Sequence, residues 1–126
     1  MKMWIAVAAG GAVGALGRYF VMVGIGAVGV IHFPIGTIVV NVIGSFLLGA
    51  LVEASALVIS VGPETRAFLV VGVLGAFTTF STFSMDVIAL VQRHDMMPAA
   101  AYIVASLVLG VGAFFAAMRL VRWLVL

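Results

Sequence analysis

The sequence contains no cysteine and very little charge. The missing cysteines exclude disulfide bridges, thiolate metal sites and cysteine nucleophiles. Charged side chains make up 8% of the 126 residues, whereas a soluble domain has about 25%. So few charges cannot keep a domain of this length in water, which excludes a soluble globular enzyme. The six Lys and Arg residues are dispersed, so we expect no binding to nucleic acid.

Hydrophobic residues are what the sequence has in excess, at 66% of the chain. A helix needs about 20 apolar residues to cross the roughly 30 Å hydrocarbon core of a bilayer. Four stretches reach this length and predict one all-α membrane domain, residues 1–126, with spans of about 4–23, 35–59, 68–91 and 98–118. The stretches are continuously apolar rather than alternating, which favours helices over the strands of a β-barrel.

The cations are divided weakly between the two sides of the membrane. Four lie on the side of the amino terminus and two on the other, namely Lys2, Arg66, Arg119 and Arg122 against Arg18 and Arg93. Two alternatives follow from this small bias. The protein either inserts with both ends in the cytoplasm, or it inserts both ways and pairs with an antiparallel copy.

Polar residues inside the second span are candidate functional groups, because each is costly in hydrocarbon unless it faces protein or water. Thr37, Asn41 and Ser45 follow one another at intervals of four and therefore share one helix face. The Asn41 amide needs several partners, either for a bond between helices or for a pore. Glu53, near the end of this span, is expected among the lipid headgroups.

The third span carries the densest polar signal of the chain. Five of the seven residues from Thr78 to Ser84 carry a hydroxyl group, and the other two are Phe80 and Phe83. The hydroxyls could bond back to carbonyls four residues earlier and bend the helix. Alternatively the helix breaks at the bilayer centre and frees carbonyls for a cation, which is tolerated only inside protein or along a cavity. We favour the break because the hydroxyls are so dense and lie at mid-membrane. Such a lining could bind a small anion through its hydroxyls and through the positive edges of the phenyl rings.

The segments from Gly36 to Gly44 and from Gly75 to Ser84 resemble the Fluc/CrcB family of bacterial fluoride channels. The resemblance covers nearly the whole chain and includes the Gly17-Arg18 pair. It implies a fluoride channel in the inner cell membrane of a bacterium, embedded in lipid, that exports fluoride passively and lowers its toxicity. It also implies an antiparallel dual-topology homodimer with helix three broken mid-membrane.

The resemblance assigns roles to particular residues. The fluoride pore would be lined by Asn41, Phe80, Phe83, Ser81, Thr82, Tyr102 and Ser106. A structural sodium ion, which is not transported, would be held at the dimer centre by the backbone carbonyls of Gly75 and Thr78. Two positions depart from the family pattern: Gly110, where some relatives carry a serine, and Asp86, where relatives often carry a glutamate.

Two other functional classes can be tested on the sequence. A small multidrug-type proton-coupled exporter also has four spans, but it needs an embedded carboxylate, typically in helix one, and residues 4–23 contain none. An enzyme would need a nucleophile, a base or a metal set, and His32 and His94 lie in separate loops. We therefore expect no enzymatic activity.

Overall fold

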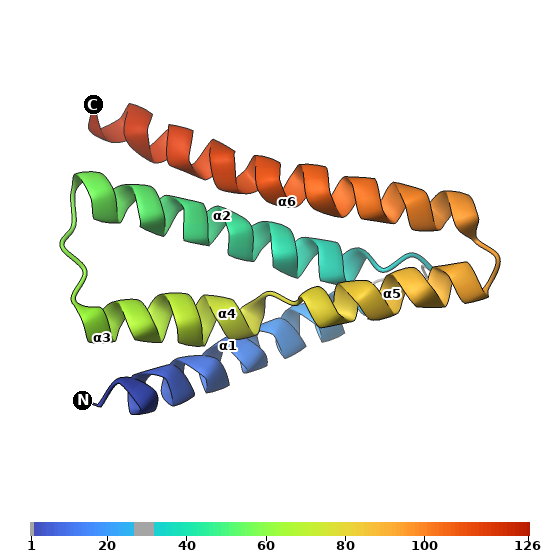
Figure 1. Cartoon of the computed structure of the whole chain (residues 1–126), viewed down its shortest axis with the longest axis horizontal. Helices are drawn as coiled ribbons and strands as arrows, with labels where there is room; N and C mark the ends of the chain where they lie inside the picture. The colour runs from blue at the N-terminus through green and yellow to red at the C-terminus, as the bar shows by residue number, and fades with distance from the viewer. Residues whose placement is uncertain (1, 27–31) are drawn as a thin grey trace.

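The chain folds into four long helices (Figure 1). The computed structural model describes residues 2–26 and 32–126. The long helices are α1 (Met3–Gly26), α2 (Ile35–Leu57), a helical run over Pro63–Gln92 and α6 (Met96–Val125). Each is long and apolar enough to cross a membrane, which confirms the predicted all-α membrane protein with four spans.

Consecutive helices run antiparallel, so both termini lie at the same end of the bundle (Figure 1). α2 packs mainly against α6, and α1 packs mainly against the first half of the run over 63–92. The outward faces are apolar, with exposed valine and phenylalanine side chains on all four helices. These faces therefore suit lipid or another protein chain rather than water.

The run over 63–92 consists of several segments. It begins with α3 (Pro63–Arg66), continues through the π-helical η1 (Ala67–Leu74) and α4 (Gly75–Phe77), and ends with α5 (Phe80–Gln92). Pro63 stands at the start, where its missing N–H removes no helical bond. Between α4 and α5 the backbone is extended, with ψ of 159° at Thr78 and 116° at Thr79.

Glycines allow the helices to approach closely at two crossings. On α1, a Cβ atom added at Gly10 or Gly14 would collide with carbonyl oxygens of η1. On α2, a Cβ atom at Gly49 would collide with the Phe114 carbonyl of α6. The small residues thus hold backbones together, as is typical of helix pairs in membranes.

Three of the four helices extend further than the predicted spans, whereas α2 ends at Leu57, two residues before the predicted end of its span at 59. The predicted turn over 24–34 begins later, because α1 continues to Gly26, and residues 27–31 lie outside the described residues. Arg18 consequently lies about two turns before the end of α1 at Gly26. α6 has 30 residues and measures about 45 Å, longer than the hydrocarbon core, which leaves room for Arg119 and Arg122 outside it.

The expectation for Glu53 is wrong. This residue is only 2% exposed, and its Oε1 accepts bonds from Nε and Nη2 of Arg122 at 2.7 Å and 2.6 Å. A buried carboxylate is costly unless it is paired, and the arginine of α6 supplies the pair. Glu53 therefore joins α2 to α6 instead of facing the headgroups.

Candidate functional site

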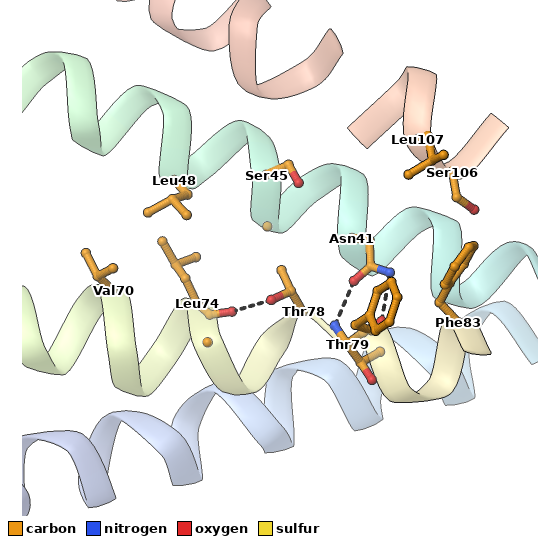
Figure 2. Close-up of a pocket in the computed structure, with 13 residues that line it drawn as sticks. Asn41, Ser45, Leu48, Val70, Leu74, Thr78, Thr79, Phe83, Ser106 and Leu107 are labelled. Carbon is orange, nitrogen blue, oxygen red and sulfur yellow. Dashed lines mark hydrogen bonds between the residues drawn. The ribbon is translucent and has the colours of Figure 1, made fainter. Parts of the chain in front are cut away.

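A cavity of about 310 Å³ lies beside the extended residues that separate α4 from α5 (Figure 2). α2, the run over 63–92 and α6 all contribute to its wall. The polar and aromatic residues that line it are Asn41, Ser45, Thr78, Thr79, Phe80, Phe83 and Ser106. The fold thus brings together residues from three helices that the sequence singled out separately.

Asn41 binds the extended backbone directly. Its Oδ1 accepts the Thr79 N–H at 2.7 Å, and its Nδ2 donates to the Thr79 carbonyl at 3.0 Å (Figure 2). The side-chain amide therefore takes the place of a neighbouring strand for one residue of non-helical backbone. Of the two alternatives for Asn41, the bond between helices is present, and the residue also lines the cavity.

The interruption redirects two amide protons that a continuous helix would use. The Thr79 N–H would bond to the Gly75 carbonyl in a regular helix, but it donates to Asn41. The Thr82 N–H would bond to the Thr78 carbonyl, but it donates to Thr79 Oγ1 at 3.1 Å. The carbonyls of Gly75 and Thr78 have thus lost their helical donors, which leaves hard oxygen ligands next to the cavity.

One cation lies near these carbonyls. Arg18 Nη1 donates to the Thr78 carbonyl across a long 3.5 Å, and a carbonyl oxygen has a second lone pair. Within residues 2–26 and 32–126, no three His, Asp or Glu side chains are grouped as metal ligands. The backbone carbonyls are therefore the cation ligands that this region offers, and they fit a sodium ion chemically.

Hydroxyl groups surround Thr79, the N-cap residue of α5. Its Oγ1 donates to Thr82 Oγ1 at 3.0 Å and lies 3.3 Å from Ser81 Oγ. Ser81 and Thr82 therefore cluster with Thr79 at the start of α5, where an N-cap hydroxyl accepts hydrogen bonds from free backbone amides. Neither Ser81 nor Thr82 lines the cavity. The hydroxyls of Thr78 and Ser84 instead donate to carbonyls four residues earlier. The segment therefore contains hydroxyls that bond back along the helix as well as hydroxyls that cluster at the interruption.

Aromatic rings form a row that leads away from the cavity. The ring centroids of Phe80 and Phe83 are 5.4 Å apart, and Phe83 stacks on Tyr102 at the same distance. Phe33 meets Tyr102 edge to face at 5.7 Å. Phe80 is 77% exposed while Tyr102 is fully buried, so the row runs from the surface of the chain into its core.

Ser106 presents a polar group to the cavity. Its Oγ is buried, and among the described residues no hydrogen-bond partner is found for it. A buried hydroxyl without a partner is costly, so this position suits a ligand that accepts or donates a hydrogen bond.

Two further polar residues, Thr37 and Asp86, belong to this region although the sequence alone does not assign them to the pore. Asp86 Oδ2 accepts bonds from Thr37 Oγ1 at 2.6 Å and from the Tyr102 hydroxyl at 2.9 Å. The signals were present in the sequence, since Thr37 shares the face of Asn41 and Asp86 follows Thr78 and Thr82 at intervals of four. The pairing of Thr37 with Asp86 across 49 residues could not be read from either pattern alone.

Comparison with known proteins agrees with this architecture. Residues 5–118 match the family model described as "CrcB-like protein, Camphor Resistance (CrcB)". The chain is 52% identical to the fluoride-specific ion channel FluC of Rhodospirillum centenum over 97% of both chains. It is 48% identical to the FluC protein of Nitrobacter winogradskyi over 94% of both, and 42% identical to that of Granulibacter bethesdensis over 99% of this chain and 98% of the relative.

Proposed function

This chain belongs to the CrcB family, and on that premise we propose that it is a fluoride-specific ion channel that lets fluoride leave the cell passively. The family consists of channels rather than enzymes, and the four membrane-crossing helices make this a multi-pass membrane protein. Its relatives are bacterial proteins, and we place this chain in the inner membrane of a bacterium. The proton-coupled exporter is not favoured by any of these relatives.

The cavity beside Thr78 and Thr79 is the observation that carries the proposal. It offers an anion the buried Ser106 hydroxyl and the edges of phenyl rings. The side-chain amide of Asn41 adds a polar group to the same wall. Among the residues that the structure describes, no lysine or arginine lines this cavity, so a small anion would be held by neutral donors and could still leave.

The row of rings and hydroxyls supports a path along α5. Phe80 and Phe83 stand at the cavity, and Tyr102 with Thr37 follows further along. Ser81 and Thr82 would contribute through the hydroxyl cluster at Thr79. An anion moving along this path would pass from the ring edges to hydroxyl groups, and the Thr37 and Tyr102 hydroxyls would turn from Asp86 to donate to it.

The interruption at Thr78 and Thr79 is proposed to be the mid-membrane break of helix three. It falls near the middle of the run over 63–92, which is long enough to cross the bilayer. Non-helical backbone at that depth has to be bonded by protein or face a cavity. Asn41 and the cavity meet both conditions.

A structural sodium ion is proposed at the carbonyls of Gly75 and Thr78. The loss of their helical donors supports this role, since carbonyl oxygens are suitable ligands for a small hard cation. The ion would supply fixed positive charge near the anion path. Thr78→Ser should have little effect on activity, because the side chain bonds only to Leu74 within its own segment.

An antiparallel dual-topology homodimer is proposed as the working unit. Phe80 lines the cavity and yet is 77% exposed, so a second chain is needed to enclose the path on that side. The rest of the apolar surface would be covered by lipid.

Purified protein in liposomes tests the function. We expect fluoride to leave down its gradient once the membrane potential is clamped, with at most a few per cent as much chloride flux. Replacing sodium by a larger monovalent cation should lower the fluoride flux, because a carbonyl cage fitted to one ion holds another poorly. Equal chloride flux, or fluoride flux that requires a proton gradient, would contradict the channel.

A further inference from the structure

A second cavity, of about 280 Å³, lies at the end of the bundle where α5 turns into α6. Its wall includes the charged side chains Asp86 and Arg93 together with His32 and Phe33. Asp86 lies in α5 and Arg93 is the C-cap residue of the same helix, seven residues later, so they lie about two turns apart on one face. Asp86 marks the inner part of the cavity and Arg93 its outer part.

The backbone at the end of α5 fixes the surroundings of Arg93. The His94 N–H donates to the Val91 carbonyl and the Asp95 N–H to the Leu90 carbonyl, which is the bonding pattern of a Schellman motif. His94 has φ of 62°, the left-handed conformation that this motif needs. The tight turn brings the Asp95 side chain back toward Arg93.

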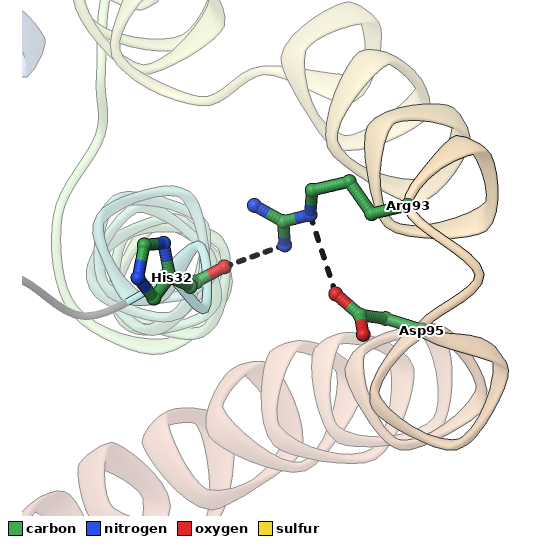
Figure 3. Close-up of polar contacts among 3 residues, drawn as sticks. All are labelled: His32, Arg93 and Asp95. Carbon is green, nitrogen blue, oxygen red and sulfur yellow. Dashed lines mark hydrogen bonds and ion pairs between the residues drawn. The ribbon is translucent and has the colours of Figure 1, made fainter.

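Arg93 is held in place by two contacts (Figure 3). Its Nη2 donates to the His32 carbonyl at 2.8 Å, and its Nε lies 3.3 Å from Asp95 Oδ2. Both partners of the ion pair are 45% exposed, so the pair is screened by water and only partly cancels the arginine charge. Neither contact uses Nη1.

The inner end of this cavity is connected to the fluoride path. Asp86 accepts bonds from Thr37 and Tyr102, and Tyr102 stacks on Phe83, which lines the first cavity. An anion that enters from this end would therefore meet the carboxylate of Asp86, which repels it. A fixed cation in the same cavity would offset that repulsion.

We propose that Arg93 is the anion-capture residue at this mouth of the channel: the guanidinium, positioned by His32 and Asp95, attracts fluoride from solution and passes it toward the first cavity. The Thr37 and Tyr102 hydroxyls on the way donate to Asp86, so each would have to turn from that carboxylate to bind the anion. The inference rests on the proposed function. It goes beyond a structural role, in which Arg93 only joins the segment before α2 to the turn between α5 and α6.

Two substitutions at Arg93 separate charge from hydrogen bonding. Arg93→Lys keeps the charge, whereas Arg93→Gln keeps a donor for the His32 carbonyl and loses the charge. At low fluoride and an ionic strength of about 0.01 M, we expect Arg93→Gln to lower fluoride flux by about 3- to 10-fold. At about 1 M the Debye length falls from about 30 Å to about 3 Å, so the difference from wild type should shrink to less than about 2-fold. The fluoride flux of Arg93→Lys should stay within about 2-fold of the wild-type flux at both ionic strengths.

A third substitution tests the sign of the effect. Asp95→Asn removes the carboxylate that partly cancels Arg93, so it should raise fluoride flux at low ionic strength although it weakens the contact. Arg119→Gln is the matched control, because Arg119 is an exposed arginine stacked on Phe115 of α6 and lines neither cavity. It should match wild type at both ionic strengths.

Several outcomes would overturn the inference. Equal losses in Arg93→Gln and Arg93→Lys at both ionic strengths, with a lower Tm in detergent, would leave only the structural role. Arg93→Gln that behaves like Arg119→Gln would show that the residue does not capture anions. Failure of wild-type protein to pass fluoride would instead overturn the proposed function, and the wild-type measurement in the same series tells the two failures apart.

Discussion

Asn41 is the single residue on which the interrupted backbone most depends, because both polar atoms of its amide bind Thr79. Asn41→Asp keeps the acceptor for the Thr79 N–H but removes the donor to the Thr79 carbonyl. We expect a loss of about 1–3 kcal/mol of stability, since a partly buried carbonyl is left without its partner. Fluoride flux should fall at least about 10-fold.

Thermal unfolding in detergent and liposome flux measure the two effects on the same preparation. Ser45→Ala is the control, since Ser45 lines the same cavity from the same helix face without binding the extended backbone. Unchanged stability and flux in Asn41→Asp would mean that the amide is dispensable for both the interruption and the path.

Substitutions at Phe80 and Phe83 test whether the edges of the phenyl rings contribute to the passage of the anion. Phe80→Ile and Phe83→Ile keep an apolar side chain but remove the positive ring edge, so fluoride flux should be blocked in each. Because isoleucine is of roughly similar volume, the stability cost should be below about 1.5 kcal/mol. Flux and dimer stability measured together distinguish the roles, and normal flux in both variants would leave the hydroxyl groups to carry the anion alone.

At the scale of helices, the contact of α1 with η1 depends on the absence of side chains. A Cβ atom at Gly14 would collide with the Val73 carbonyl, whereas a Cβ atom at Gly11 would meet nothing within 4 Å. Gly14→Ala should therefore cost about 1–3 kcal/mol through overpacking, and Gly11→Ala should be neutral or slightly stabilising. A Tm lower by at least about 4 °C in Gly14→Ala alone would agree with this expectation; equal Tm values in both variants would contradict it.

The helices and the polar segment were predictable from local sequence, for physical reasons. A span needs only a sufficient run of apolar residues, so all four were visible. The hydroxyl-rich segment from Thr78 to Ser84 contains both the extended residues and the cap of α5, because these side chains compete with helical hydrogen bonding. Asn41 was recognised as a polar group that needs partners, and Thr79 provides them.

The features that escaped prediction depend on contacts between distant residues. Glu53 is buried because Arg122, 69 residues away, reaches it from α6. Asp86 joins the region of the path because Thr37 and Tyr102 converge on it from two other helices. No periodicity within one helix contains such information, since it depends on which faces the packed bundle brings together.

For the whole molecule, the structure changes how the cations on the two sides of the membrane should be counted when orientation is predicted. Arg122 is paired with Glu53 and Arg93 with Asp95, while Arg18 reaches the Thr78 carbonyl inside the bundle. Acidic partners contribute little to orientation, so Arg93 and Arg122 still count, whereas Arg18 lies about two turns before the end of its helix. The cations near the ends of spans are then four on the side of the termini and one, Arg93, on the other side, and an experiment on orientation has to decide whether the chain inserts in both directions.

Added lysines should fix the orientation and reveal whether antiparallel pairing is required. Leu124→Lys with Leu126→Lys adds charge at the end that holds both termini, and Met96→Lys with Met97→Lys adds it at the opposite end; all four side chains are exposed. Either variant expressed alone should insert one way and lose fluoride flux, because no antiparallel partner is formed. Co-expression of the two should restore flux, since each supplies the orientation that the other lacks. Accessibility labelling of the two ends measures orientation in the same membranes, and full flux from a population labelled from one side only would rule out antiparallel assembly.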